Sequence, residues 1–323
     1  MNAPAAMRRL LAVLAVATVV FAVFFTLVRP WYLRWGATDA ELAVTRPGEE
    51  LVPGAPERST RAVTIMAPAE QVWPWLAQLG QDRGGLYSYE VLEDLAGCEM
   101  PRARQIMPEH QSWKFGEKLW MYPPDKLEGI GGARLVAYEP GKHLVFATRR
   151  LTTSMREPEN GIWGFVVEPV DAGATRLVAY GRAASERAPL AAGFARGVFE
   201  PAHYVMERRM MQNVKSLAEG GEPSKQEELI EVALWTITLG LIVAALAGVA
   251  RRRLWGRALG VAVLGALVFQ VLTLLQPPVT WGAVLVTWLA LSLWWGDRPL
   301  RFDVPGWTRR YSTRATLSPG EMV

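Results

Sequence analysis

The side chains best suited to acid–base chemistry stand close together near position 110. Glu109 and His110 are adjacent, and Glu99, Arg102 and Arg104 come a few residues before them. A carboxylate and an imidazole can act as general acid and base, and two guanidinium groups can hold an anion. At the mouth of a cavity such a set would mark an active site, whereas in an open loop the same charges would only be solvated. We favour the solvated loop, and keep Glu109 and His110 as candidate catalytic residues.

Motifs for other common chemistries are missing from the sequence. There is no phosphate-binding Walker loop, no nucleophile elbow and no helical zinc-protease motif. His110, His143 and His203 fall in three separate predicted elements, so we favour ordinary hydrogen-bonded histidines over a zinc site. The single cysteine, Cys98, excludes an internal disulfide. The sequence therefore predicts neither a metal nor a cofactor.

Aromatic residues crowd the central part of the chain. Aromatic rings can fill a core, or they can line an apolar cavity in which tyrosine hydroxyls orient a ligand. Core filling is the better explanation for most single residues, but for the whole set we expect some cavity lining. The predicted ligand-binding residues are Tyr87, Tyr89, Trp120, Trp163 and Tyr204.

The central part begins with a predicted strand and two short helices, the second of which would position Tyr87 and Tyr89. Residues 37–58 are rich in proline, glycine and threonine and predict a loop-like lead-in. Residues 61–65 alternate and are β-branched, which predicts a strand. A proline and an acidic residue then open a helix over 69–79, and a second short helix covers 87–95.

A series of short strands and one long helix follow. Turn signals separate the strands so closely that they must pair antiparallel. Apolar residues at helical spacing predict a helix over 190–218, which Pro201 kinks or divides. This order predicts an α+β helix-grip domain, a curved antiparallel sheet around a long C-terminal helix, with a cavity between them. The candidate strands cover residues 117–122, 133–138, 143–148, 161–167 and 175–182.

Four long apolar runs without a charged residue flank the domain. Each has about the 17–20 residues that cross the hydrocarbon core of a bilayer as a helix, so we predict about four transmembrane helices. An uncleaved anchor is favoured over a signal peptide for the first run, because no small-x-small cleavage site follows it. The runs cover 10–28, 232–250, 258–275 and 279–295. The predicted organisation is an N-terminal membrane anchor at 1–30, the folded domain at 58–220, three transmembrane helices within 229–296, and a cytoplasmic tail at 297–323.

Basic residues beside the runs predict the orientation. Arg8 and Arg9 precede the first run, four arginines lie within 251–257, and five more follow residue 297. By the positive-inside rule both termini are cytoplasmic and the domain is extracytoplasmic. Arg29 and Arg34 argue the other way but are outnumbered. The net charge of +4 is modest and grouped near the membrane, which suits lipid better than nucleic acid, so we expect no nucleic-acid partner.

Several segments of the domain resemble one superfamily. Residues 62–76, AVTIMAPAEQVWPWL, are similar to the opening of the START-like, polyketide-cyclase/dehydrase (SRPBCC) superfamily. Residues 84–89 (GGLYSY), 138–142 (YEPGK) and 163–169 (WGFVVEP) add to the likeness, which covers about 58–217. The chain looks like uncharacterised bacterial members with attached membrane helices. The resemblance implies a helix-grip cavity for lipids, sterols, polyketides or other apolar molecules, and a place in the bacterial inner or plasma membrane. The superfamily shares no catalytic motif, so no catalytic residue is carried over.

Three functions are compatible with these features. We favour a membrane-tethered domain that binds a hydrophobic small molecule or lipid between the sheet and the long helix. One alternative is a cyclase- or dehydratase-type enzyme acting on an apolar substrate, with Glu99, Glu109, His110 or a cavity tyrosine as acid or base. The other alternative is a protein-interaction module with a vestigial cavity, whose partner would be another membrane protein.

Overall fold

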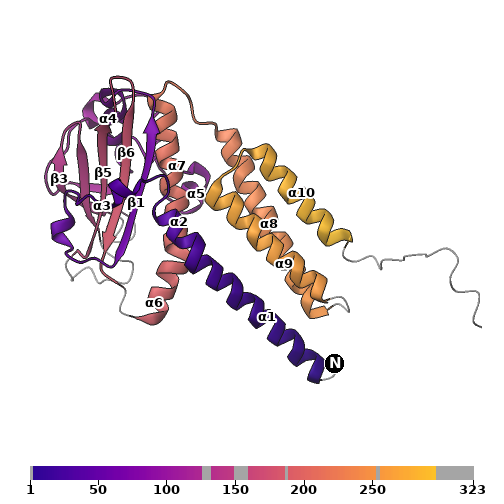
Figure 1. Cartoon of the computed structure of the whole chain (residues 1–323). Helices are drawn as coiled ribbons and strands as arrows, with labels where there is room; N and C mark the ends of the chain where they lie inside the picture. The colour runs from indigo at the N-terminus through magenta and orange to yellow at the C-terminus, as the bar shows by residue number, and fades with distance from the viewer. Residues whose placement is uncertain (1–2, 126–131, 149–158, 186–187, 252–254, 296–323) are drawn as a thin grey trace, which may run out of the picture.

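The computed structural model describes residues 3–125, 132–148, 159–185, 188–251 and 255–295. Figure 1 shows a sheet domain at one end of the molecule and a group of long helices at the other, with one long helix of the domain between them. The predicted cytoplasmic tail at 297–323 lies outside the described residues.

Six strands form one sheet in which every neighbouring pair is antiparallel. The order across the sheet is β1-β6-β5-β4-β3-β2, so the first strand pairs with the last. The short strand β2 forms the opposite edge. The predicted antiparallel series is therefore confirmed, and the strand predicted at 61–65 begins earlier, at Glu57. The strands are β1 (Glu57–Ile65), β2 (Lys118–Trp120), β3 (Gly132–Glu139), β4 (His143–Thr148), β5 (Gly161–Pro169) and β6 (Thr175–Ala183).

One long helix packs against the sheet and confirms the predicted helix-grip architecture. It consists of α6 (Pro189–Phe194), a π-helical turn (Ala195–Phe199) and α7 (Glu200–Ala218). Pro201 does not divide the helix, although a proline inside a helix removes one hydrogen-bond donor. The chain instead takes a π-helical turn just before Pro201, in which the Glu200 N–H donates to the Ala195 carbonyl. Two shorter helices, α4 (Ala69–Ala77) and α5 (Glu90–Leu95), complete this side.

The main core lies between the sheet and α7. Alternate residues of β5 face it, because successive side chains of a strand point to opposite faces. Trp163 and Phe165 pack there in one apolar cluster with Met210, Met211 and Val214 of α7. Four tryptophans belong to this cluster, so aromatic rings occupy much of the space that the sequence assigned to a cavity.

The other face of the sheet is covered by residues 38–56, which the sequence had predicted as a loop-like lead-in. They form α3 (Asp39–Ala43) and a 3-10 turn (Glu49–Leu51). Val52 packs on a cluster of Val145, Ile162 and Tyr180, and the Tyr180 hydroxyl donates to the Pro47 carbonyl at 2.6 Å. The segment is also fixed by ion pairs to the strands: Arg46–Glu168 at 3.2 Å, Arg176–Glu41 at 2.6 Å and Arg182–Glu49 at 2.8 Å. Folding of the sheet therefore involves residues before position 58.

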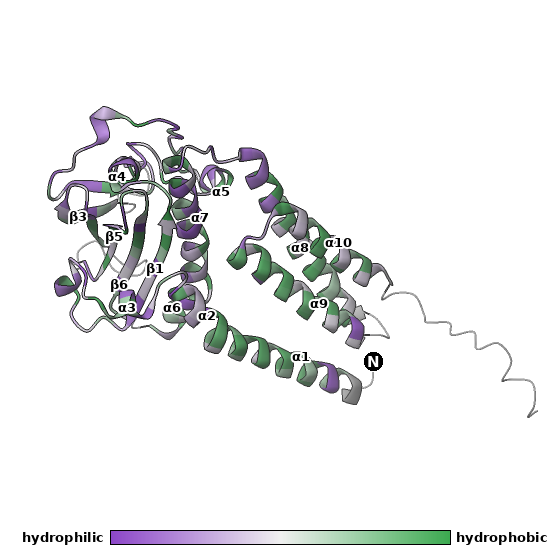
Figure 2. Ribbon diagram, turned by 45° about the horizontal axis from the view of Figure 1, so that its top comes forward, coloured by the Kyte–Doolittle hydropathy of each residue, from purple (hydrophilic) through white to green (hydrophobic). Residues whose placement is uncertain are grey.

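The long apolar helices form the second part of the molecule. Within the described part of the chain, three are long and apolar enough to cross a membrane: Ala6–Leu33, Lys225–Ala250 and Trp255–Leu275. The fourth predicted span is a shorter apolar helix, Val279–Trp294, so a count of four stays a prediction. Figure 2 shows α1, α9 and α10 as hydrophobic along most of their length. The helices are α1 (Ala3–Val23), which continues through a π-helical turn (Phe24–Val28) into α2 (Arg29–Leu33), then α8 (Lys225–Arg251), α9 (Trp255–Gln270) with a π-helical turn (Val271–Leu275), and α10 (Val279–Trp295).

The two ends of these helices differ in what they contact. At one end Arg9 of α1 donates to the carbonyl of Ala250, near the end of α8, at 3.5 Å. At the other end the turn after α9 meets the domain, where the Gln276 amide donates to the Val205 carbonyl at 3.2 Å. The start of α1 and the end of α8 thus lie together, away from the domain (Figure 1).

Candidate functional site

A buried ion pair lies inside the domain, between the sheet and α7. The Arg61 guanidinium of β1 contacts the Glu207 carboxylate of α7, and only 1% and 2% of the two side chains is exposed. Arg61 Nε also donates to the Tyr32 carbonyl at 2.9 Å, and the Trp163 indole donates to Glu207 Oε1 at 2.6 Å. Both carboxylate oxygens are thus hydrogen-bonded. A carboxylate occupied in this way serves as a structural anion more readily than as a general base.

The charge state of Glu207 follows from this arrangement. Burial acts to raise the pKa of the carboxyl group. The positive charge of Arg61 and the hydrogen bonds from Arg61 and Trp163 outweigh burial and hold the pKa of Glu207 below its usual value. Glu207 is therefore ionised at neutral pH, and the two buried groups stabilise each other.

Aromatic rings surround the ion pair. Tyr204 stacks on Tyr32 of α2 with ring centroids 5.2 Å apart, and the Arg61 guanidinium lies over the Tyr204 ring at 5.1 Å. His203 meets the Trp163 ring edge-on at 5.6 Å, and burial lowers the pKa of this histidine. The cluster joins the domain interior to the end of the first apolar helix, because Tyr32 belongs to that helix.

The five predicted ligand-binding residues lie in four different places. Trp163 and Tyr204 flank the ion pair, and the Tyr204 hydroxyl donates to the Leu274 carbonyl at 3.1 Å. Tyr89 faces α8, where its hydroxyl donates to Glu231 at 2.6 Å. Trp120 is half-buried on the edge strand β2, under the Lys118 ammonium. The structure thus does not bring all five to one cavity, and their binding role stays a prediction.

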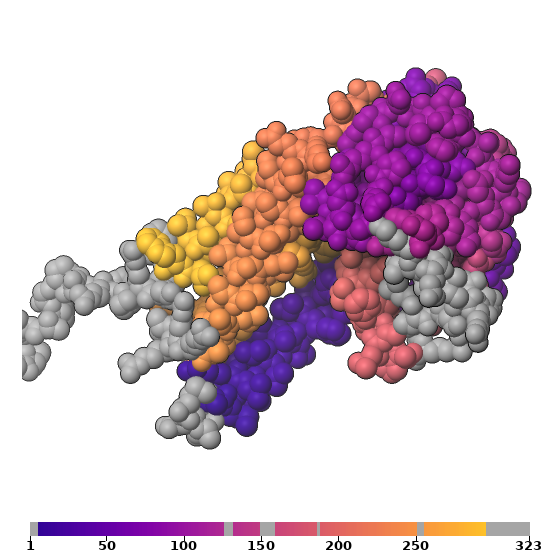
Figure 3. Space-filling view, turned by 180° about the vertical axis from the view of Figure 1, so that it is seen from behind, coloured from indigo at the N-terminus to yellow at the C-terminus, as the bar shows by residue number. Residues whose placement is uncertain are grey.

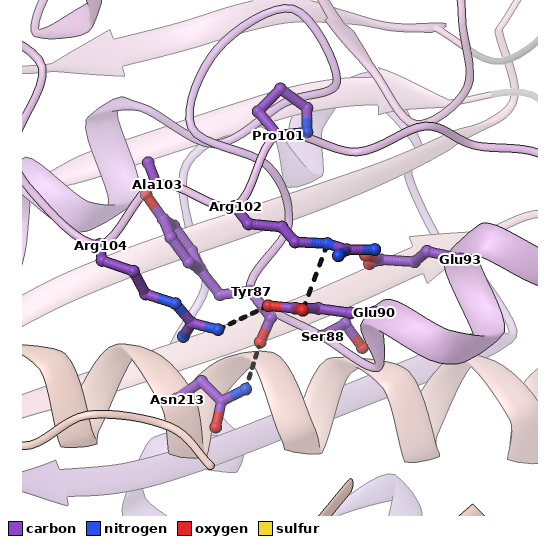
Figure 4. A pocket seen from close by; sticks show the side chains of 9 residues that line it. All are labelled: Tyr87, Ser88, Glu90, Glu93, Pro101, Arg102, Ala103, Arg104 and Asn213. Atoms are coloured by element: carbon purple, nitrogen blue, oxygen red, sulfur yellow. Dashed lines mark hydrogen bonds and ion pairs between the residues drawn. The ribbon is translucent and has the colours of Figure 1, made fainter. Parts of the chain in front are cut away.

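Tyr87, the fifth predicted residue, borders a small hollow between α5 and α7 (Figure 4). Its hydroxyl accepts from the Gln78 amide at 2.6 Å, and its carbonyl accepts from Asn213 of α7 at 2.8 Å. Arg102 and Arg104 pair with Glu90 at 3.2 and 2.6 Å across the hollow. The volume open to the centre of a water molecule is about 10 Å³, which is room for about one water. The hollow is therefore too small for an organic ligand.

Glu93 is the unusual member of this hollow. It is buried, and its Oε1 atom has no hydrogen-bond partner among the described residues. Burial, with a smaller contribution from the carboxylates of Glu228 and Glu90, raises the pKa of Glu93 to about 8. Glu228 comes from α8 and accepts the Val91 N–H of α5 at 2.7 Å, so this acidic cluster lies where the domain meets the apolar helices.

The candidate catalytic pair lies apart from both sites. Glu109 and His110 belong to an exposed 3-10 turn, Pro108–His110, and the His110 carbonyl accepts from Arg83 at 2.9 Å. Arg102 and Arg104, predicted as an anion clamp, instead pair with Glu90 and Asp94. Neither Glu109 nor His110 borders the hollow beside Tyr87 or the groove described next. Among the described residues no three His, Cys, Asp or Glu side chains gather as a metal site would require.

An open groove lies at the end of the domain opposite α6, where α4 begins and α7 ends. Its volume is about 510 Å³, within the range of small-molecule sites. Apolar side chains and an acidic residue at each margin line it, and Trp75 at its base is buried against Tyr87 with ring centroids 5.9 Å apart. The groove is lined by Met66, Glu70, Gln71, Pro74, Trp75, Ile106, Leu217, Ala218, Glu219 and Gly220.

The buried ion pair could have been predicted from the sequence, although Arg61 and Glu207 belong to no chemical motif. Arg61 occupies the same face of its strand as Ile65, which is fully buried. Glu207 lies one turn before Met210 and Met211 on the buried face of α7. One basic and one acidic residue at positions where the pattern requires apolar side chains predict a buried pair, because a lone buried charge is too costly. Glu93 gave no such signal, since it looks like an exposed residue of a short acidic helix.

The chain is similar to several solved protein structures. No protein-family model and no curated protein matches the chain. A protein from Thermobifida fusca, solved by solution NMR, is similar at 14% identity and a TM-score of 0.34, over 52% of this chain and 97% of that one. The Aha1 dimer from Colwellia psychrerythraea is similar at 14% identity and a TM-score of 0.31, over 52% of this chain and 99% of that one. The di-domain ARO/CYC BexL from the BE-7585A biosynthetic pathway is similar at 12% identity and a TM-score of 0.29, over 50% of this chain and 47% of that one.

Proposed function

We propose that this chain is a membrane-tethered, SRPBCC-type helix-grip domain that binds an apolar small molecule in the groove between α4 and the end of α7. The groove itself is the observation that carries the proposal. It is the larger of the two hollows described above and has exposed apolar side chains, Met66 and Ile106, on its margins. The interior beside α7 is a poorer candidate, because aromatic rings and the Arg61–Glu207 pair fill it.

The lining also suggests the chemistry of the ligand. Pro74, Trp75, Ile106 and Leu217 offer an apolar surface, on which a flat or branched hydrocarbon would pack. Glu70 is exposed at the margin and favours a ligand whose polar end is neutral or positively charged. A polyketide-like or isoprenoid-like molecule would fit this description.

The tether and its orientation belong to the same proposal. The chain would cross the membrane with its three long apolar helices and the shorter α10. The contact between Arg9 and Ala250 brings the start of α1 to the end of α8, away from the domain, and in the sequence arginines adjoin both of these ends. This arrangement supports cytoplasmic termini and an extracytoplasmic domain in a bacterial inner or plasma membrane.

Charged substitutions in the groove are expected to weaken binding of an apolar probe. For Met66→Asp and Ile106→Asp in the full chain in detergent, we expect about tenfold weaker binding of Nile red, or about 1.4 kcal/mol. Both side chains are exposed, so the fold should tolerate the change. Phe115→Asp is the matched control, because Phe115 is also an exposed apolar residue but lies outside the groove. Fluorescence titration measures the affinity, and mass spectrometry of co-purified small molecules identifies natural ligands.

The same titration tests the second candidate function. The filled interior around Arg61 and Glu207 favours a protein-interaction module with a vestigial cavity. If Met66→Asp, Ile106→Asp and Phe115→Asp all bind Nile red like the unchanged chain, and the folded protein carries no small molecule, the groove is not a ligand site. The interaction module would then be the better account.

A further inference from the structure

The first turns of the long domain helix present an apolar face that the domain does not cover. No residue of α6 or of the following π-helical turn is buried. Leu190, Phe194, Val198 and Phe199 are exposed by 90, 55, 54 and 44% of their surface. Residues four apart share one face of a helix, so Leu190, Phe194 and Val198 form a continuous stripe, here called the α6 stripe, with Phe199 beside it.

This stripe differs from the other exposed apolar residues of the domain. Met66, Leu95 and Phe115 are exposed in three separate elements, and scattered apolar residues on a surface are common. The α6 stripe instead places three large apolar side chains in line on eleven residues of helix that contain one charged residue, Arg196.

Ion pairs fix this helix beside the domain-side end of the first apolar helix. Arg29 follows directly after the apolar run and pairs with Glu200 at 2.7 Å and with Glu57 at 3.0 Å. Arg196 pairs with the same Glu57 at 2.5 Å, and the Tyr32 hydroxyl donates to Glu200 at 2.6 Å. The charges of this helix are thus turned toward the domain and α2, and its apolar stripe is left free of them.

The position of α6 matches the level at which the first helix leaves a membrane. Glu200 lies beside Arg29, and the chain from Glu200 back to Pro189 continues the helix beyond the domain. Figures 1 and 3 both place α6 beside the domain-side end of α1. Trp31, a residue type that prefers the headgroup layer, is partly exposed at the same end.

We propose that the α6 stripe lies in the headgroup and acyl-chain boundary of the leaflet on the domain side, as a second membrane contact of this domain. The occupant is lipid because the stripe adjoins the end of a helix that itself would enter the same leaflet, and because an amphipathic helix with large apolar residues on one face binds in that layer. The inference rests on the membrane tether of the proposed function. The stripe would hold the domain close to the bilayer and turn its groove away from it.

Site-directed spin labelling of the full chain tests this contact. The single cysteine is first removed by Cys98→Ser, with an unchanged melting temperature as the requirement for this parent. Leu190→Cys, Phe194→Cys and Val198→Cys are then labelled with a nitroxide and reconstituted in vesicles of phosphatidylethanolamine and phosphatidylglycerol. Oxygen concentrates in lipid and a nickel chelate in water, so the ratio of their effects on the label reports its depth. We expect a ratio severalfold higher at these three positions than at Phe115→Cys.

Two other outcomes would overturn the proposal. A ratio equal to that of Phe115→Cys at all three positions would place the stripe in water. Protection from both oxygen and the nickel chelate would place it against protein, either a second copy or a partner. Leu14→Cys, on an exposed part of α1, reports on the tether separately. If the label at Leu14→Cys also lies in water, the first helix does not span the membrane. If that label lies in lipid while the labels on the α6 stripe lie in water, only the proposed contact of the stripe is rejected.

Discussion

Glu207→Ala is expected to lower the free energy of unfolding by about 3–5 kcal/mol, because it leaves Arg61 buried without a counter-charge. Arg61 keeps only the Tyr32 carbonyl as a hydrogen-bond acceptor, and the Trp163 indole loses its acceptor. Unfolding of the full chain in detergent, followed by tryptophan fluorescence in increasing urea, measures the effect.

Two further variants decide whether charge burial is the cause. Glu159→Ala is the matched control, because Glu159 pairs with the more exposed Arg134 and such a pair contributes about 1 kcal/mol or less. The double variant Arg61→Met with Glu207→Leu removes both charges and should lose less stability than Glu207→Ala alone. A double variant that is less stable than the single one would contradict this account and assign the effect to lost packing.

The contribution of the Glu207 pair also depends on pH in a defined direction. The pKa of Glu207 is lower in the folded than in the unfolded protein. Its contribution is therefore fully present above the unfolded value of about 4.5 and is lost as the pH falls through the folded value. The difference between the unchanged chain and Glu207→Ala should shrink in acid.

Glu93→Gln is expected to stabilise the protein at alkaline pH and to change it little near pH 4. The folded pKa of about 8 lies above the unfolded value of 4.5, so the folded state holds a proton that the unfolded state has released between these values. Over that window the unchanged chain should lose up to about 1.4 kcal/mol of stability per pH unit, and the loss is complete above the folded value. A glutamine keeps the shape of the protonated acid without its titration.

Melting temperatures of the unchanged chain and Glu93→Gln between pH 4 and pH 9 measure the effect. His143 and His203 have lowered pKa values and titrate in both proteins, so the difference between the two curves isolates Glu93. Glu70→Gln makes the same substitution at an exposed glutamate and is the control. Parallel curves for Glu93→Gln would mean that Glu93 is ionised in the folded state at neutral pH.

The sheet and the long helix could be predicted because each depends on a local pattern. Alternating and β-branched residues mark the second half of β1, and apolar residues at helical spacing mark the helix that ends at Ala218. The role of residues 38–56 could not be predicted in this way. They have little periodicity, and they are held by ion pairs to Glu168, Arg176 and Arg182, more than a hundred residues further along the chain.

The candidate site was harder to predict for a similar reason. Tyr89 and Tyr204 were predicted to line a cavity, with hydroxyls that orient a ligand. In the structure those hydroxyls donate to Glu231 of α8 and to the Leu274 carbonyl after α9. A single sequence gives no information on how a domain is placed against long apolar helices of the same chain. Two residues chosen for a cavity therefore lie at the contact between the domain and those helices.

The domain is braced between two of the long apolar helices, which are almost two hundred residues apart in the chain. On one side the Tyr32 carbonyl of α2 binds Arg61, and on the other Tyr89 and α5 bind Glu231 and Glu228 of α8. A domain held at more than one point cannot swivel about a single tether. A tilt of the first helix relative to α8 therefore has to distort one of these contacts. The strain would fall on the buried Arg61–Glu207 pair on one side, or on the acidic cluster around Glu93 on the other.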